Sequence, residues 1–134
     1  MQNTYLRVKG IVEKDGKYLL LQRFVDDHIP EPFVWEFVEG LVNFGEKPSD
    51  AVLRCVEEVL SAPCKVEKIL YDWSLVLGDS HCVGIAYLCC LENEDEPFTL
   101  AEEYGEAIWV EKEELEQYLE NPYTLKDVLA GLEM

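Results

Sequence analysis

The sequence predicts an α+β domain in which helices pack on both sides of a mixed β-sheet. Strand-like runs lie on both sides of a helical segment near residues 48–60, and two helical segments follow the last strand. Such an order of elements favours a layered α/β/α arrangement. The chain has 134 residues, enough to bury one hydrophobic core, so we expect a single domain over residues 1–134.

The first strands are indicated by alternating apolar residues and turn signals. Apolar and other residues alternate in the segment YLRVKGIVE at 5–13. The turn signal KDG at 14–16 separates this segment from KYLLLQR at 17–23. We therefore expect a hairpin. Residues 24–33, FVDDHIPEPF, contain two prolines and predict a loop, whereas residues 34–40, VWEFVEG, predict a short strand.

A helix is predicted from Pro48 to about Leu60, after a loop at residues 41–47. Proline suits the first turn of a helix, and the sequence Ser-Ala-Pro at 61–63 ends it. The apolar positions of this helix cover about half of its circumference, which is wider than a usual core-facing stripe. We therefore expect it to be the best-buried helix of the domain.

The rest of the chain continues the alternation of strands and helices. The predicted elements are strands at 64–77 and 81–91 with a turn at 78–80, an acidic turn at 92–97, a short strand at 107–110, and helices at 112–119 and 124–132. Asn121-Pro122 separates the two helices.

The charge balance excludes several classes of partner. The chain has 11 basic and 28 acidic residues, a formal net charge of -17. A polynucleotide or an anionic membrane needs Lys and Arg to displace counterions, so we expect neither as a partner. A small anionic ligand still fits if divalent metal ions neutralise part of the charge.

Composition also predicts the compartment. No apolar run reaches the 18 residues of a membrane span, and the first residues lack a basic start followed by an apolar stretch, so we expect neither a membrane helix nor a signal peptide. Five cysteines are an odd number without a C-x-x-C pair, which indicates buried free thiols: Cys55, Cys64, Cys82, Cys89 and Cys90. We therefore expect a cytoplasmic protein. Whether it forms a homodimer is left open.

The most specific pattern is the segment GLVNFGEKPSDAVLRCVEEV at residues 40–59. Gly40 is followed by Glu46 after five intervening residues, and Glu46 by Arg54 after seven. This spacing joins a glycine, a loop carboxylate and a helical arginine. Carboxylates gathered near a loop-to-helix junction are typical of metal and phosphate chemistry.

A metal site on the predicted helix would need several carboxylates on one face. Positions 55, 58 and 59 share one face, because residues three and four apart are neighbours on a helix. A magnesium site there needs carboxylates, but the sequence offers Cys55, Glu58 and Val59. Cysteine is a soft ligand that suits Mg²⁺ poorly, and valine can neither coordinate a metal ion nor accept a proton.

The segment resembles the Nudix box of the Nudix hydrolases. That box reads Gly, five residues, Glu, seven residues, and then Arg-Glu-aliphatic-any-Glu-Glu-any-Gly-aliphatic. Five positions match at full spacing: Gly40, Glu46, Arg54, Val56 and Glu58. The preceding Trp35-Glu36-Phe37 is similar to the family's lead-in. The order of elements agrees over essentially the whole chain, which implies a Nudix-like α/β/α sandwich with a mixed sheet and a central box helix.

The departures from the box are equally specific. Cys55 replaces the first glutamate after the arginine, Val59 replaces the second residue of the Glu-Glu pair, and Ser61 replaces the closing glycine. Glu39 and Val38 stand where family members usually have Gly and Pro. Another register would align Glu57-Glu58 with the family pair, but it needs a deletion inside the helix, and we prefer the ungapped register.

The resemblance implies roles for individual residues. Glu58 is the candidate for catalysis and for metal binding, and Glu39, Glu103 and Gly40 are further candidate metal-binding residues. Glu103 lies six positions before Trp109, where the family often has another carboxylate. Alternatively, Glu58 is an ordinary exposed helical glutamate and Glu39 points to solvent.

For the two remaining box residues, a structural role is favoured. Glu46 and Arg54 are interpreted as an ion pair between loop and helix rather than as catalytic groups.

Nudix enzymes use Mg²⁺ or Mn²⁺ to hydrolyse nucleoside diphosphates linked to another group, so the resemblance implies these ions and a small nucleotide derivative as substrate. With two of three helix carboxylates replaced, we expect an eroded metal site and weak hydrolase activity. The alternatives are an inactive module that binds a nucleotide or a protein partner, and a purely structural role.

Overall fold

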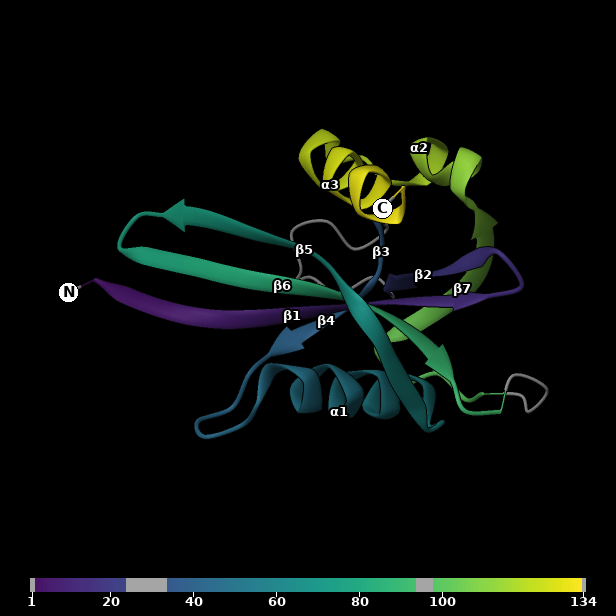
Figure 1. Cartoon of the computed structure of the whole chain (residues 1–134), viewed down its shortest axis with the longest axis horizontal. Helices are drawn as coiled ribbons and strands as arrows, with labels where there is room; N and C mark the ends of the chain where they lie inside the picture. The colour runs from purple at the N-terminus through teal and green to yellow at the C-terminus, as the bar shows by residue number, and fades with distance from the viewer. Residues whose placement is uncertain (1, 24–33, 94–97, 134) are drawn as a thin grey trace.

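The computed structural model describes residues 2–23, 34–93 and 98–133, and its strands form a mixed sheet between helices (Figure 1). The elements in chain order are β1 (Asn3–Lys14), β2 (Lys17–Arg23), β3 (Trp35–Glu36), β4 (Val38–Leu41), α1 (Pro48–Leu60), β5 (Cys64–Leu77), β6 (Ser80–Leu91), β7 (Tyr104–Glu111), the 3₁₀ turn η1 (Lys112–Glu114), α2 (Leu115–Tyr118) and α3 (Pro122–Leu132). The predicted loop at 24–33 and most of the acidic turn at 92–97 lie outside the described residues.

Strand β1 holds the sheet together because it pairs with three other strands. It runs parallel to β6, from Asn3 opposite Ser80 onward, and antiparallel to β4 on its other edge. After β1 the chain turns at Asp15-Gly16 and returns as β2, which pairs with the end of β1 and also with β3 and β7. The strand order is β3-β2-β1-β6-β5, with β4 attached to β1 and β7 to β2.

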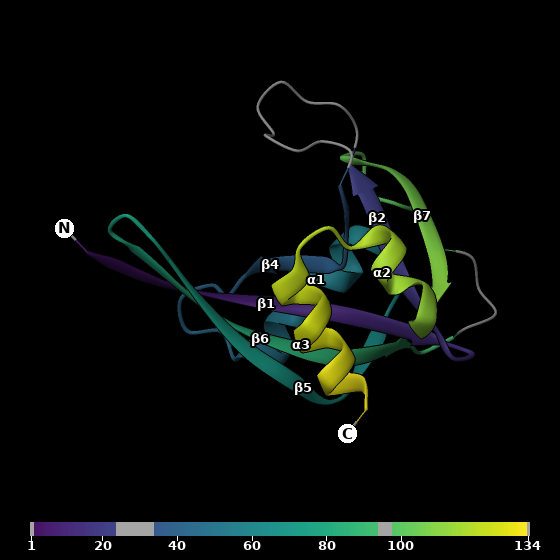
Figure 2. The same ribbon diagram turned by 90° about the horizontal axis from the view of Figure 1, so that it is seen from above.

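Helices cover both faces of this sheet (Figures 1 and 2). Helix α1 packs against β1, β4 and β5 on one face, while α3 lies on the opposite face against β5. The core is correspondingly divided. One part, under α1, includes Val52 and Val56, and the other includes Phe37 and Val128. The α/β/α layering predicted from the sequence is confirmed.

Most element boundaries agree with the sequence prediction. The helix at 48–60 and both hairpins are confirmed, and all five cysteines are buried free thiols. Two strands differ. The predicted strand at 34–40 is split into β3 and β4, because its first half pairs with β2 and its second half with β1. The last strand starts at Tyr104 rather than at 107, since pairing with β2 continues to Arg23.

In the part of the chain that the structure describes, no helix is long and apolar enough to cross a membrane.

Candidate functional site

The loop that precedes α1 is fastened to the helix by a two-point ion pair. Arg54 donates from Nε to Glu46 Oε2 over 2.9 Å and from Nη2 to Glu46 Oε1 over 3.0 Å. Arg54 Nη2 also donates to the Leu41 carbonyl over 2.7 Å, and the Asn43 backbone N–H donates to Glu46 Oε1. The hydrogen bond from Arg54, followed by that from Asn43, lowers the pKa of Glu46. This is the geometry expected of a structural pair.

The helix face at positions 55, 58 and 59 has two buried members and one exposed member. Cys55 and Val59 are 5% and 7% exposed, whereas the Glu58 side chain is 64% exposed. Burial raises the pKa of the Cys55 thiol, which therefore stays protonated at neutral pH. Glu58 accepts long hydrogen bonds of 3.4 and 3.5 Å from Arg54 Nη1.

The first residue of the box packs directly on this face. A Cβ added at Gly40 would overlap Cys55 Sγ, so the absence of a side chain at Gly40 lets β4 approach the helix. At the other end of α1, Ser61 has φ 53° and ψ 37° and donates its backbone N–H to Glu57 O. This left-handed conformation favours glycine, the residue that the ungapped register places here.

The two further candidate carboxylates lie on other elements. Glu39 is on β4, where its Oε1 accepts a 2.8 Å hydrogen bond from Arg7 Nε. Glu103 is exposed in the turn before β7 and acts electrostatically on Arg23. Among the described residues, no three His, Cys, Asp or Glu side chains form a group that could hold a metal ion, so Glu58, Glu39 and Glu103 are not brought together. Their metal-binding roles stay predictions.

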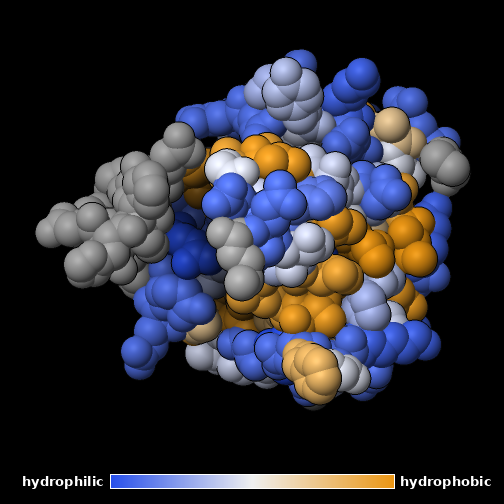
Figure 3. Space-filling model, turned by 90° about the vertical axis from the view of Figure 1, so that its left-hand side faces the viewer, coloured by the Kyte–Doolittle hydropathy of each residue, from blue (hydrophilic) through white to orange (hydrophobic). Residues whose placement is uncertain are grey.

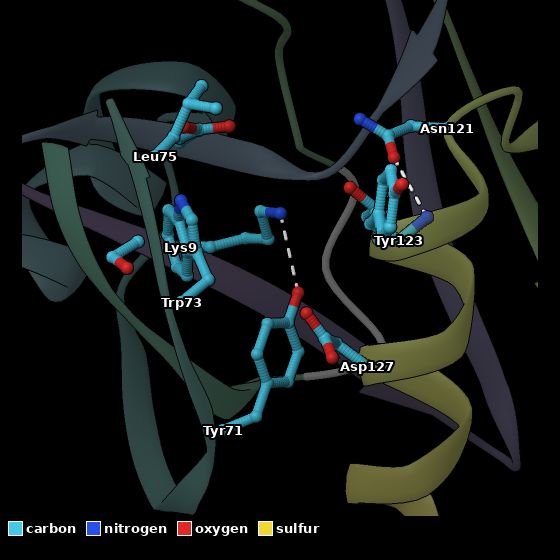
Figure 4. A pocket seen from close by; sticks show the side chains of 10 residues that line it. Lys9, Tyr71, Trp73, Leu75, Asn121, Tyr123 and Asp127 are labelled. Carbon is cyan, nitrogen blue, oxygen red and sulfur yellow. Dashed lines mark hydrogen bonds between the residues drawn. The ribbon is translucent and has the colours of Figure 1, made fainter. Parts of the chain in front are cut away.

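A pocket that the sequence did not predict lies between β1, β5 and α3 (Figure 4). We call it the Lys9 pocket. It has a volume of about 550 Å³ and is lined by Lys9, Glu39, Tyr71, Trp73, Ser74, Leu75, Asn121, Tyr123, Thr124 and Asp127. A smaller hollow of about 190 Å³ adjoins it and shares Lys9, Glu39, Asn121 and Thr124. Pockets of this size that combine aromatic walls with a few polar groups are typical of ligand sites.

Lys9 forms the floor of the pocket and is only 8% exposed. Its Nζ donates to Tyr71 OH over 3.3 Å and lies 4.6 Å from the centroid of the Trp73 ring. Burial lowers the pKa of Lys9, and this effect is opposed mainly by the negative charges of Glu39 and Asp127. A buried amine is thus held among two rings and two carboxylates.

The opposite wall belongs to the start of α3. Asn121 caps this helix by accepting hydrogen bonds from the backbone N–H groups of Tyr123 and Thr124 at its Oδ1. The cap presents the Asn121 side chain and the Tyr123 ring beside the pocket, and Asp127 follows on the same helix (Figure 4). Tyr123 is 79% exposed, so its ring is accessible at the mouth.

Few features of the sequence indicate this pocket. Lys9 lies in the alternating segment of β1 like a solvent-facing lysine, and its burial depends on Tyr71 and Trp73 of β5, which are distant in sequence. Trp35 and Trp73 pack on the core only in part and also line the two hollows. The usable signal was Asn121-Pro122, which places a helix start next to the sheet.

One end of the molecule carries several exposed apolar side chains. Figure 3 looks onto the end where β1 begins and the β5–β6 hairpin turns, and it shows a broad apolar area with polar residues around it. Leu75, Val76 and Leu77 at the end of β5 are between 52% and 65% exposed. Leu75 also lines the Lys9 pocket.

Comparison with known proteins identifies the family. A family model described as NUDIX domain matches residues 6–130. The nucleoside triphosphatase NudI of Escherichia fergusonii is 30% identical to this chain, covering 91% of it and 93% of the relative. The chain therefore belongs to the Nudix family.

Solved structures agree on the fold. The E. coli ORF135 protein has a TM-score of 0.80 at 23% identity, covering 98% of this chain and 91% of that one. The MutT protein from Methanosarcina mazei Go1 has a TM-score of 0.81 at 19% identity, covering 98% and 95%. At these identities the likeness establishes the Nudix fold and nothing about substrate.

Proposed function

We propose that this chain is a nucleotide-binding Nudix protein with an eroded metal site, which hydrolyses nucleoside diphosphate-linked compounds only weakly. Its relative NudI is named a nucleoside triphosphatase, and this supports a nucleotide derivative as the ligand. Nudix hydrolases generally use divalent metal ions, and Mg²⁺ or Mn²⁺ are the ions we propose for any residual activity.

The observation that carries the proposal is the burial of Cys55 and Val59 on the helix face. The face offers one carboxylate, Glu58, together with a protonated thiol and a valine. Mg²⁺ requires several oxygen ligands in near-octahedral geometry, so this donor set does not fit such an ion well. A face that holds a metal ion poorly supports only weak turnover.

The Lys9 pocket supports retained ligand binding. Its residues come from β1, β4, β5, α3 and the N-cap Asn121. Positions 55, 59 and 61 are not among them, whereas Glu39, another departure from the family pattern, is. Loss of helix carboxylates therefore leaves the pocket intact. This observation favours, as the second candidate, a catalytically inactive module that binds a nucleotide without cleaving it.

A turnover screen tests the proposal. Phosphate release is measured over nucleoside diphosphate derivatives and triphosphates with Mg²⁺ and with Mn²⁺. We expect rates at least about 10³-fold below an intact Nudix enzyme, because ligand and base are lost together. Glu58→Gln should remove the residual rate, whereas the matched change Glu57→Gln on the same helix should not. Rapid metal-dependent turnover would contradict the proposal, and binding without turnover would select the second candidate.

Other expectations about partners remain proposals. A net charge of -17 supports our proposal that the protein binds neither polynucleotides nor anionic membranes. A protein partner or a second copy of the chain is compatible with the apolar end formed by Leu75, Val76 and Leu77. Light scattering in solution measures whether a homodimer forms. Fractionation of cells tests the proposed cytoplasmic location.

A further inference from the structure

Lys9 has hydrogen-bonding capacity that the protein itself uses only in part. An ammonium group carries three donors. Among the described residues, the hydrogen bond from Lys9 Nζ goes to Tyr71 OH, and Lys9 forms no ion pair within 4 Å. The side chain is more than nine-tenths buried and its Nζ lies in the pocket (Figure 4). Two of the three donors of Lys9 Nζ are therefore open to a ligand that enters the pocket, and a ligand acceptor placed there gains a hydrogen bond to a charged donor.

An acceptor stands beside this donor. Asp127 projects from α3 toward the Tyr71 hydroxyl and the Lys9 amine (Figure 4), and its charge acts on both groups. Glu39, the other carboxylate in the pocket, is occupied by Arg7. Asp127 is therefore the carboxylate available to accept a hydrogen bond from a ligand N–H.

The charges and walls of the pocket narrow the ligand class. The charge of Lys9 is opposed by that of Asp127, and Glu39 is balanced by its ion pair with Arg7, so the pocket has no net positive charge to attract a phosphate or carboxylate group. Tyr71 and Trp73 on β5 and the accessible Tyr123 ring on α3 line the same space, which suits a planar ligand. A neutral heterocycle that has both an acceptor and a donor meets these conditions.

We infer that the Lys9 pocket selects nucleotides whose base carries a lactam edge, a ring carbonyl next to a ring N–H. Hypoxanthine, guanine, uracil and thymine have this edge. Lys9 donates to the carbonyl and Asp127 accepts from the N–H. Adenine and cytosine present an amino group and an unprotonated ring nitrogen instead, which would set a donor against Lys9 and a lone pair against Asp127. The inference rests on the proposed nucleotide-binding function.

Two pairs of nucleotides isolate this edge. Inosine and adenosine 5′-monophosphates differ only in the atoms at the lactam edge, and so do the uridine and cytidine monophosphates. Calorimetric titration of the whole chain should give Kd values at least about tenfold lower for the inosine and uridine members of the pairs. The sugar and phosphate are constant within each pair and cannot cause the difference.

Two variants test the assignment of residues. Lys9→Met keeps the length and apolar stem of the side chain but removes the donors, and it should bring the two members of each pair to within about threefold of one another. Asp127→Asn should also reduce the preference for the inosine and uridine monophosphates. If Lys9→Met does not fold, Asp127→Asn alone tests the assignment. Lys17→Met on β2 and Glu116→Gln on α2 are matched controls at exposed positions outside the pocket, and both should retain the preference.

The outcomes are distinct. If none of the four nucleotides binds, the proposed nucleotide-binding function fails and the inference fails with it. If all four bind equally, or if adenosine and cytidine monophosphates bind more tightly, the inference is overturned while nucleotide binding stands. A preference that survives in both the Lys9 and the Asp127 variants also overturns it. Loss of the preference in the pocket variants, with retention in both controls, supports it.

Discussion

The Cys55 thiol packs against the backbone of Gly40, the first residue of the box. The two residues belong to α1 and β4, and a Cβ on Gly40 would overlap Cys55 Sγ. A side chain that the ungapped register aligns with a metal-binding glutamate is here part of the contact between helix and sheet. Position 55, a candidate ligand position in the ungapped register, is therefore a packing position in this chain.

Gly40→Ala is expected to destabilise the protein by about 1–3 kcal/mol, because an added methyl group cannot be accommodated in a packed contact. Urea unfolding measures the loss. Cys55→Ala removes the sulfur that the new methyl group would meet, so the same Gly40 change should cost clearly less in that background. Strictly additive effects of the two changes would show that Gly40 and Cys55 are not in contact.

Ser61→Gly should stabilise the protein by about 0.5–1 kcal/mol. Ser61 ends α1 in a left-handed conformation, which costs a residue with a Cβ roughly 1–2 kcal/mol, and glycine's greater freedom in the unfolded chain offsets part of this gain. The urea midpoint should rise with an unchanged slope. The control is Ser49→Gly in the first turn of the same helix, which should not stabilise. An equal gain at both serines would contradict this explanation.

The register of the box was predictable from sequence because its signals are local. Spacing from Glu46 to Arg54, Pro48 at the helix start and a stop after Leu60 all fall on one continuous segment. The ion pair of Glu46 with Arg54 and the left-handed Ser61 agree with the ungapped register. The split between β3 and β4 was not predictable, since it depends on two partner strands that lie elsewhere in the chain.

Glu46→Gln should lower stability at neutral pH, and the difference from the unchanged protein should shrink in acid. The Arg54 hydrogen bond lowers the pKa of Glu46 in the folded protein, so the folded state binds a proton less readily than the unfolded state. This contribution is present above the ordinary pKa of 4.5 and is lost as the pH falls through the lowered value.

Urea titrations between about pH 7 and pH 3 measure this effect. Glu57→Gln is the matched control, because it removes the same charge from an exposed position of α1. A stability difference for Glu46→Gln that grows on acidification would contradict the sign of the pKa shift.

The pocket could not be predicted from sequence for a physical reason. Lys9 and Asp127 are separated by most of the chain, and they approach one another only because α3 folds back over the sheet. Burial of a lysine within an alternating strand has no local signature. The same holds for Glu39, whose position next to Gly40 indicated the metal site but whose side chain accepts a hydrogen bond from Arg7 on β1.

The final prediction concerns restoration of the metal-binding face. Cys55→Glu combined with Val59→Glu places carboxylates at positions 55, 58 and 59, which share one face of α1. These substitutions should lower the stability of the folded protein, because both positions are buried and the new negative charges repel one another and Glu58 when no metal ion is bound. We therefore expect the double variant to be less stable than the parent protein without metal and to recover stability when Mn²⁺ or Mg²⁺ is added.

Calorimetric titration with Mn²⁺ should show tighter binding in the double variant than in the parent protein. Gln2→Glu with Gln117→Glu adds the same charge at exposed positions away from α1 and should leave Mn²⁺ binding unchanged, which separates a built site from general attraction. Adding Glu39→Gln to the double variant should also leave the Mn²⁺ affinity unchanged, because Glu39 pairs with Arg7 and does not bind the metal ion. Equal Mn²⁺ affinity in the folded double variant and in the charge control would show that positions 55, 58 and 59 do not form the metal-binding face.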